Sequence, residues 1–188
     1  MAKRYEEDKS GIESNTVGVY RTAATVKGGR RFSFSGMVVC GDRRGRVGLG
    51  YGKANQVPNA IEKAQKKAKQ AMRNYPLTGT TIPHQVTGRF GACTVRLVPA
   101  SPGTGVIAGA AVRAVLDLVG VQDCLSKAYG STNNKNLTKA VIDGLQQLRS
   151  REQVESLRKI KIEKTHIEEA HDTLPEPVSA EVVVEVSE

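Results

Sequence analysis

Aromatic residues are scarce in this chain of 188 residues, which has no tryptophan, five tyrosines and three phenylalanines. Proteins that hold single-stranded nucleic acid usually stack its bases on aromatic rings, so this scarcity argues against that mode of binding. The three cysteines, Cys40, Cys93 and Cys124, lie far apart and form no CxxC pair. We therefore expect reduced thiols in the core, with neither a disulfide framework nor a zinc site.

A catalytic constellation is also missing from the sequence. His84, His166 and His171 are scattered, and no serine, histidine and acid stand in a recognisable set. The glycines at 48, 50 and 52 are not followed by the GK[ST] of a phosphate-binding loop. We predict that the chain is not an enzyme, with no cofactor, no catalytic residue and no metal ligand.

No hydrophobic run is long enough to span a bilayer, and residues 1–8 contain no apolar core for export. We expect a cytoplasmic protein without a membrane partner. Positive charge is plentiful, with 28 Lys and Arg against 19 Asp and Glu. All 28 precede residue 165 and seven acidic residues follow it, so the earlier part carries 28 basic against 12 acidic residues, or +16. A charge of that size predicts a polyanionic partner.

The sequence predicts an α+β protein of two small domains. We expect residues 1–16 to be a flexible arm and 17–76 a three-stranded antiparallel meander backed by a helix. The predicted strands are Val17–Thr25, Phe32–Gly41 and Arg46–Ala54. Pro58 suits the first turn of the helix, and a helical spacing relates Val57, Ile61, Ala64, Ala68 and Met72.

The second predicted domain, residues 84–150, is a two-layer α/β unit. Its expected strands are Val86–Gly88, Cys93–Val98 and Val121–Ala128. One expected helix packs on the sheet through a narrow apolar face, which consists of Ile107, Ala110, Ala111, Ala114 and Leu118. The other expected helix spans Asn136–Leu148. Residues 151–164 predict a terminal helix that frays. Residues 165–188 predict a disordered acidic tail, although Val182–Val184 is prone to pair with a strand edge.

Two turns rich in glycine and arginine are the segments that most clearly indicate a function. Lys27–Arg31 joins the first two predicted strands and Arg43–Arg46 the next two, so the turns lie at opposite ends of the meander. Glycine allows backbone amides to approach phosphate, and long cations neutralise it. The predicted RNA-binding residues in these turns and on the following strand and helix are Lys27, Gly28, Gly29, Arg30, Arg31, Arg43, Arg44, Arg46, Lys53, Lys63, Lys66 and Lys67.

Two motifs have alternative interpretations. Phe32 and Phe34 share a face and suggest a base-stacking pair, but that face continues into Val38 and Cys40, so we predict a core position. The segment Gly103–Ala108 matches the dinucleotide pattern GxGxxA, with Asp123 twenty residues beyond its first glycine. A nucleotide- or phosphate-binding enzyme built on this loop is the alternative to RNA binding, although prolines stand between the strand and the glycines.

Four segments between residues 20 and 148 resemble the bacterial small-subunit ribosomal protein S-five family. They read TVKGGRRFSFSGMVVCGD, GRVGLGYGKANQVPNAIEKA, PASPGTGVIAGAAVRAVLDLVGV and KAYGSTNNKN. The resemblance implies a first domain like those that bind double-stranded RNA, and a second domain whose fold recurs in phosphate-binding enzymes. It also implies a structural constituent of the 30S subunit, bound to 16S rRNA beside the S-four and S-eight proteins.

The resemblance assigns roles to individual positions. The loop from Arg21 to Arg31 would reach toward rRNA near the mRNA path. Gly103, Gly105 and Arg113 would lie at the contact with the S-four protein, where changes alter translational accuracy. Ala24 replaces a lysine common in bacterial members, and Arg43–Arg44 replaces a shorter uncharged turn. The acidic extension past Thr165 has no counterpart in the family.

Overall fold

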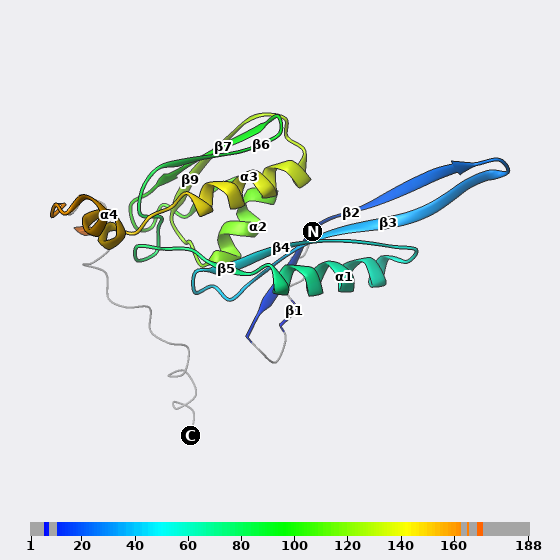
Figure 1. The fold of residues 1–188 in the computed structure, drawn as a ribbon, viewed down its shortest axis with the longest axis horizontal. Coiled ribbons are helices and arrows are strands. Elements are labelled where there is room, and N and C mark those ends of the chain that lie inside the picture. Colours follow the sequence, from blue (N-terminus) through cyan, green and yellow to red (C-terminus); the bar gives the residue numbers. More distant parts are fainter. Residues whose placement is uncertain (1–5, 8–10, 163–164, 166–168, 171–188) are drawn as a thin grey trace, which may run out of the picture.

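Residues 6–7, 11–162, 165 and 169–170 are described by a computed structural model (Figure 1). They form a five-stranded sheet in the order β1-β2-β3-β4-β5 and a four-stranded sheet in the order β6-β7-β9-β8. The predicted α+β class with two domains is confirmed. Most of the expected acidic tail, residues 165–188, lies outside the described residues.

The first sheet is the predicted meander with a short strand at each edge. Its elements are β1 (Glu6–Glu7), β2 (Glu13–Val26), β3 (Gly29–Gly41), β4 (Arg46–Ala54), α1 (Val57–Gln70) and β5 (Arg73–Asn74). Strand β2 begins inside the stretch expected to be a flexible arm, because Glu13–Thr16 pair with Val38–Gly41 of β3. The β3–β4 pairing ends at Phe34 and Ala54. Beyond it, β2 and β3 pair only with each other and project as a long two-stranded hairpin (Figure 1).

Helix α1 packs unusually close to β4 because every second residue of that strand is glycine. A Cβ at Gly48, Gly50 or Gly52 would collide with the helix backbone, at the carbonyl oxygens of Ala68, Ala64 and Ala60 respectively. The three alanines are buried. The glycines that lack a phosphate-loop signature thus have a packing role, since glycine opposite alanine lets a helix and a strand approach closely.

The second domain places two helices under its sheet. Its elements are β6 (Val86–Phe90), β7 (Cys93–Pro99), β8 (Val106–Ile107), α2 (Ala110–Val119), β9 (Cys124–Gly130), α3 (Asn134–Gln146) and α4 (Arg151–Arg158). The placement of Ile107 on the helix was wrong, because it lies in β8, parallel to β9, and is 54% exposed. Helix α2 is also buried more broadly than the narrow face predicted, since it packs between the two sheets (Figure 1).

The two domains share one hydrophobic core. Val39 and Val47 of the first sheet belong to the same buried cluster as α2 and α3, whereas Val38 and Cys40 on the opposite face pack on α1. The turn between β3 and β4 is bonded to the end of α2, where the Arg43 amide donates to the Leu118 carbonyl at 3.1 Å. The layers therefore run from the second sheet through α2 and α3 to the first sheet and then α1 (Figure 1).

Candidate nucleic-acid interface

The projecting hairpin is an exposed cationic element. We call residues 21–34 the ribbon. It carries Arg21, Lys27, Arg30 and Arg31 and no acidic residue, and all four of these side chains are exposed. A Cβ at Gly28 in its tip would meet no atom within 4 Å, and the tip residues 26–31 are exposed. A slender, acid-free element of this kind suits insertion between phosphate backbones.

Phe32 has a different role from the core position that the sequence predicted. It is 46% exposed, and the Arg21 guanidinium lies 4.7 Å from the centre of its ring. The core prediction was wrong because β4 ends before reaching this part of β3, so there is no third strand or helix to cover the ring. Phe32 instead supports Arg21 through a cation–π contact on one face of the ribbon.

Four predicted lysines meet in one groove between β4 and α1. Lys63, Lys66 and Lys67 lie on one side of the helix, and Lys53 faces them from the strand. The groove has a volume of about 400 Å³, and Tyr51, Gly52 and Gln70 complete its lining, so no acidic residue contributes. We call it the lysine groove. Ammonium groups converging without a carboxylate among them form a favourable site for successive phosphates.

The second basic turn is held by partners within the protein. Arg43 forms an ion pair with Glu13 at 2.6 Å, and Arg46 forms one with Asp42 at 2.6 Å. Asp42 also accepts hydrogen bonds from the amides of Arg44 and Arg46. Burial opposes ionisation of Asp42, but these hydrogen bonds outweigh it and lower its pKa. The structure therefore separates this turn from the ribbon and places it at the junction with α2.

A contact that the sequence does not reveal anchors the root of the hairpin. The Lys135 ammonium at the start of α3 lies 4.4 Å from the ring centre of Tyr20 and 5.1 Å from that of Tyr51. A hydrogen bond with Ser35 lowers the pKa of Tyr51 against the opposing effect of burial, and the charges of Lys135 and Lys53 lower it further. One lysine of the second domain thereby connects β2 and β4 of the first.

The loop that matches a dinucleotide pattern is held by a hydrogen bond within the protein. The Gly105 amide donates to one carboxylate oxygen of buried Asp123 at 2.9 Å, and the Thr80 hydroxyl donates to the other at 2.7 Å. Strand β8 and Gly109 then separate the glycines from the first turn of α2. A dinucleotide site needs the glycine turn to lead directly into the helix and needs the acid for a ribose, so this geometry does not support one.

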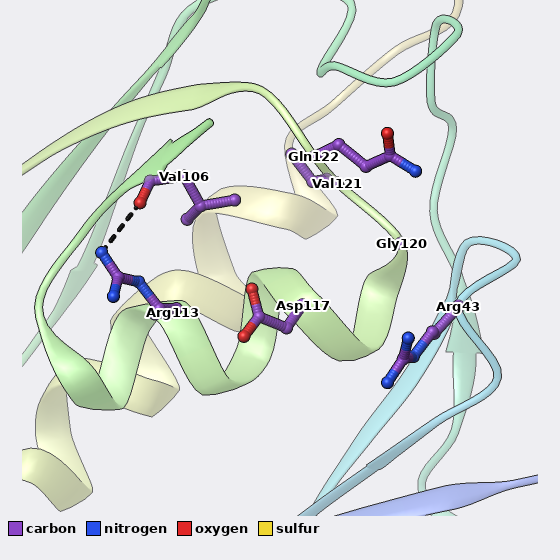
Figure 2. A pocket seen from close by; sticks show the side chains of 7 residues that line it. All are labelled: Arg43, Val106, Arg113, Asp117, Gly120, Val121 and Gln122. Atoms are coloured by element: carbon purple, nitrogen blue, oxygen red, sulfur yellow. Dashed lines mark hydrogen bonds between the residues drawn. The ribbon is translucent and has the colours of Figure 1, made fainter. Parts of the chain in front are cut away.

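A surface pocket of about 520 Å³ lies between the two domains, beside this loop. Figure 2 shows Arg113 and Asp117 projecting from α2, with Arg43 on the facing turn. The Arg113 guanidinium donates to the Val106 carbonyl at 3.0 Å. Of the three residues predicted at a protein contact, Arg113 lines the pocket, while Gly103 and Gly105 lie in the loop that precedes β8.

The described residues offer neither a metal site nor a membrane-spanning helix. No cluster of three or more His, Cys, Asp or Glu side chains in residues 11–162 is arranged to hold a metal ion. Across the same part of the chain, none of the helices has both the length and the apolar character needed to cross a bilayer. The fold presents a cationic ribbon and a lysine groove on one domain, and such a surface suits an extended polyanion.

Comparison with known proteins gives the family. The profile described as "Ribosomal protein S5, N-terminal domain" matches residues 12–76, and "Ribosomal protein S5, C-terminal domain" matches residues 88–158. The small ribosomal subunit protein uS5 of Rhodopirellula baltica is 53% identical over 150 residues, which cover 80% of this chain and 85% of that protein. The uS5 protein of Psychromonas ingrahamii is 47% identical over 162 residues, which cover 86% of this chain and 97% of that protein.

This chain belongs to the ribosomal protein S5 family. The uS5 protein of Rubrobacter xylanophilus, 54% identical over 153 residues that cover 81% of this chain and 76% of that protein, is a further relative. The family is structural and not enzymatic, in agreement with the prediction from the sequence. Residues 159–188 lie beyond both matched domains.

Proposed function

We propose that this chain is a structural constituent of the small ribosomal subunit in the cytoplasm and that it binds 16S rRNA through the ribbon and the lysine groove. The observation that carries the proposal is the ribbon, an exposed hairpin with four cations and no acidic residue. A compact body with this charge distribution needs a polyanion to offset it. Its mechanism is positioning, since the residues that bind are cations without catalytic partners.

The ribbon and the groove suit different parts of a folded RNA. The ribbon is two strands wide beyond Phe34, so it can enter a space between RNA helices while Arg30 and Arg31 point to opposite faces. The lysine groove is broader and lies on the surface of the domain, where it can track the phosphates along one helix. Both contacts are made to the backbone, which fixes register and orientation without reading sequence.

We further infer that the loop at Gly103–Gly105, together with Arg113, contacts the S-four protein and that this contact supports translational accuracy. Asp123 holds the loop in a fixed position through Gly105, and Arg113 stands on the rim of the pocket at the domain junction. The ribbon would then extend toward the mRNA path from the other domain of the shared core. The resemblance of the chain to its family also favours the S-eight protein as a neighbour.

Binding to transcribed 16S rRNA over a range of salt concentrations tests the proposal. Replacing Arg30 and Arg31 together by alanine should reduce the slope of log K against log salt by about 2, and replacing Lys63 and Lys66 should do the same. A matched control, Arg158→Ala with Lys159→Ala on and after α4, should leave the slope unchanged. An equal loss in all three double variants would mean that binding depends on net charge alone, and the proposal would be wrong.

A further inference from the structure

The second sheet has one face that none of the described residues covers. Helices α2 and α3 pack on its inner face, where Val95, Leu97 and Cys124 are buried (Figure 1). Because side chains alternate along a strand, the intervening residues point to the other side. The residues on this outer face are Thr87, Arg89, Thr94, Arg96, Val98, Ile107, Leu125, Lys127 and Tyr129.

The outer face combines cations with large exposed apolar groups. Ile107 is 54% exposed and its register partner Leu125 is 38% exposed, while Tyr129 is 52% exposed. Arg96 pairs in register with Lys127 on the neighbouring strand, where like charges repel unless an anion lies between them. No acidic residue lies on these strands at an outward position. An occupant must therefore supply both negative charge and apolar side chains.

The end of the chain has this composition, and α4, which leads toward it, begins beside the face. The Arg149 amide, just before α4, donates to the His84 ring at 3.1 Å, and the adjacent Gln85 accepts a hydrogen bond from Arg96 at 2.9 Å. Residues 176–188 contain four glutamates and five valines and no Lys or Arg.

We propose that the C-terminal segment of this chain, residues 176–188, packs on the outer face of the second sheet. Its valines cover Ile107 and Leu125, and its glutamates lie between Arg96 and Lys127 and relieve their repulsion. The segment lies beyond both matched family domains, and the face is separate from the ribbon and the lysine groove, so the docking does not rest on the proposed RNA contacts. Docking of the segment covers a third cationic surface, which then does not compete with the ribbon and the lysine groove for RNA phosphates.

A spin label at the end of the full-length chain tests the docking. The label is attached to a Ser187→Cys variant, because the native cysteines are buried and burial raises the pKa of the Cys124 thiol to about 11. We expect the amide signals of Arg96, Leu125 and Lys127 to lose more than half of their intensity. The loss should disappear in about 1 M salt, where the screening length is about 3 Å.

Charge reversal supplies the controls. The double variant Arg96→Glu with Lys127→Glu should abolish the loss, whereas Lys66→Glu with Lys67→Glu in the lysine groove should leave it unchanged. Loss centred on the lysine groove, or spread evenly over the molecule, would overturn the proposal. The proposal would also be wrong if the amide signals of the outer face kept their intensity with the label attached but shifted when a single-stranded oligonucleotide was added. That result would assign the face to RNA. An effect that appears only between labelled and unlabelled molecules would assign it to a second copy.

Discussion

Gly50 of β4 lies directly against the backbone of Ala64 in α1, so close that a Cβ at position 50 would collide with the Ala64 carbonyl oxygen. The contact is repeated one turn of the helix away on each side, at Gly48 with Ala68 and at Gly52 with Ala60. These pairs set the distance between α1 and the sheet. They also position the lysine groove, because Gly52 and Lys53 form its strand side and α1 forms its helix side.

Gly50→Ala should destabilise the fold by about 1–3 kcal/mol, since the added methyl group meets backbone that cannot rotate away. The urea midpoint of unfolding measures this change. Gly28→Ala in the ribbon tip is the matched control, because a Cβ there meets nothing within 4 Å. If both variants unfolded at the same midpoint, α1 would not be fixed by close approach to β4.

Asp42 should make the domain junction sensitive to acid. Its pKa is lowered from the ordinary 3.8, so its contribution to stability is present above pH 3.8 and is lost as the pH falls through the lowered value. The free energy of unfolding of the native chain should therefore fall more steeply in this range than that of Asp42→Asn. Glu62→Gln, on the exposed side of α1, should retain the native dependence. Identical curves for all three proteins would contradict the role given to Asp42.

Asp123→Ala should cost about 1–3 kcal/mol, because it leaves the Gly105 amide and the Thr80 hydroxyl without their buried acceptor. Hydrogen exchange should also become faster at the Gly105 amide. Thr104→Ala is the control in the same loop, since the Thr104 hydroxyl bonds only locally to the Ser101 carbonyl among the hydrogen bonds described. Unchanged exchange at Gly105 in Asp123→Ala would show that the carboxylate does not fix the loop.

Much of the fold follows from patterns within short stretches. The strands of the meander alternate as strands do, and the helical spacing of Ala64 and Ala68 places α1 correctly. The lysine groove was predictable in its residues, because Lys63, Lys66 and Lys67 recur at helical spacing after Lys53. The opposite placement of the two basic turns followed from the order of the hairpins.

The features that sequence reasoning missed depend on distant segments. The alternation of side chains along the strand predicts which face Phe32 lies on, but it does not predict the length of the neighbouring strand. The Phe32 ring is exposed because β4 ends before reaching it. The contact of Lys135 with Tyr20 and Tyr51 joins two domains and leaves no local pattern. The shared core was missed for the same reason, since Val39 and Val47 look like residues of a sheet with one buried face.

Sedimentation tests whether this chain is part of the small ribosomal subunit. A cell lysate is run through a sucrose gradient, and the chain is located before and after magnesium depletion separates the subunits. We predict that it sediments with intact ribosomes and then with the small subunit, and that a variant lacking the four ribbon cations is depleted from both. A chain that stays at the top of the gradient under both conditions would show that it is not part of the subunit.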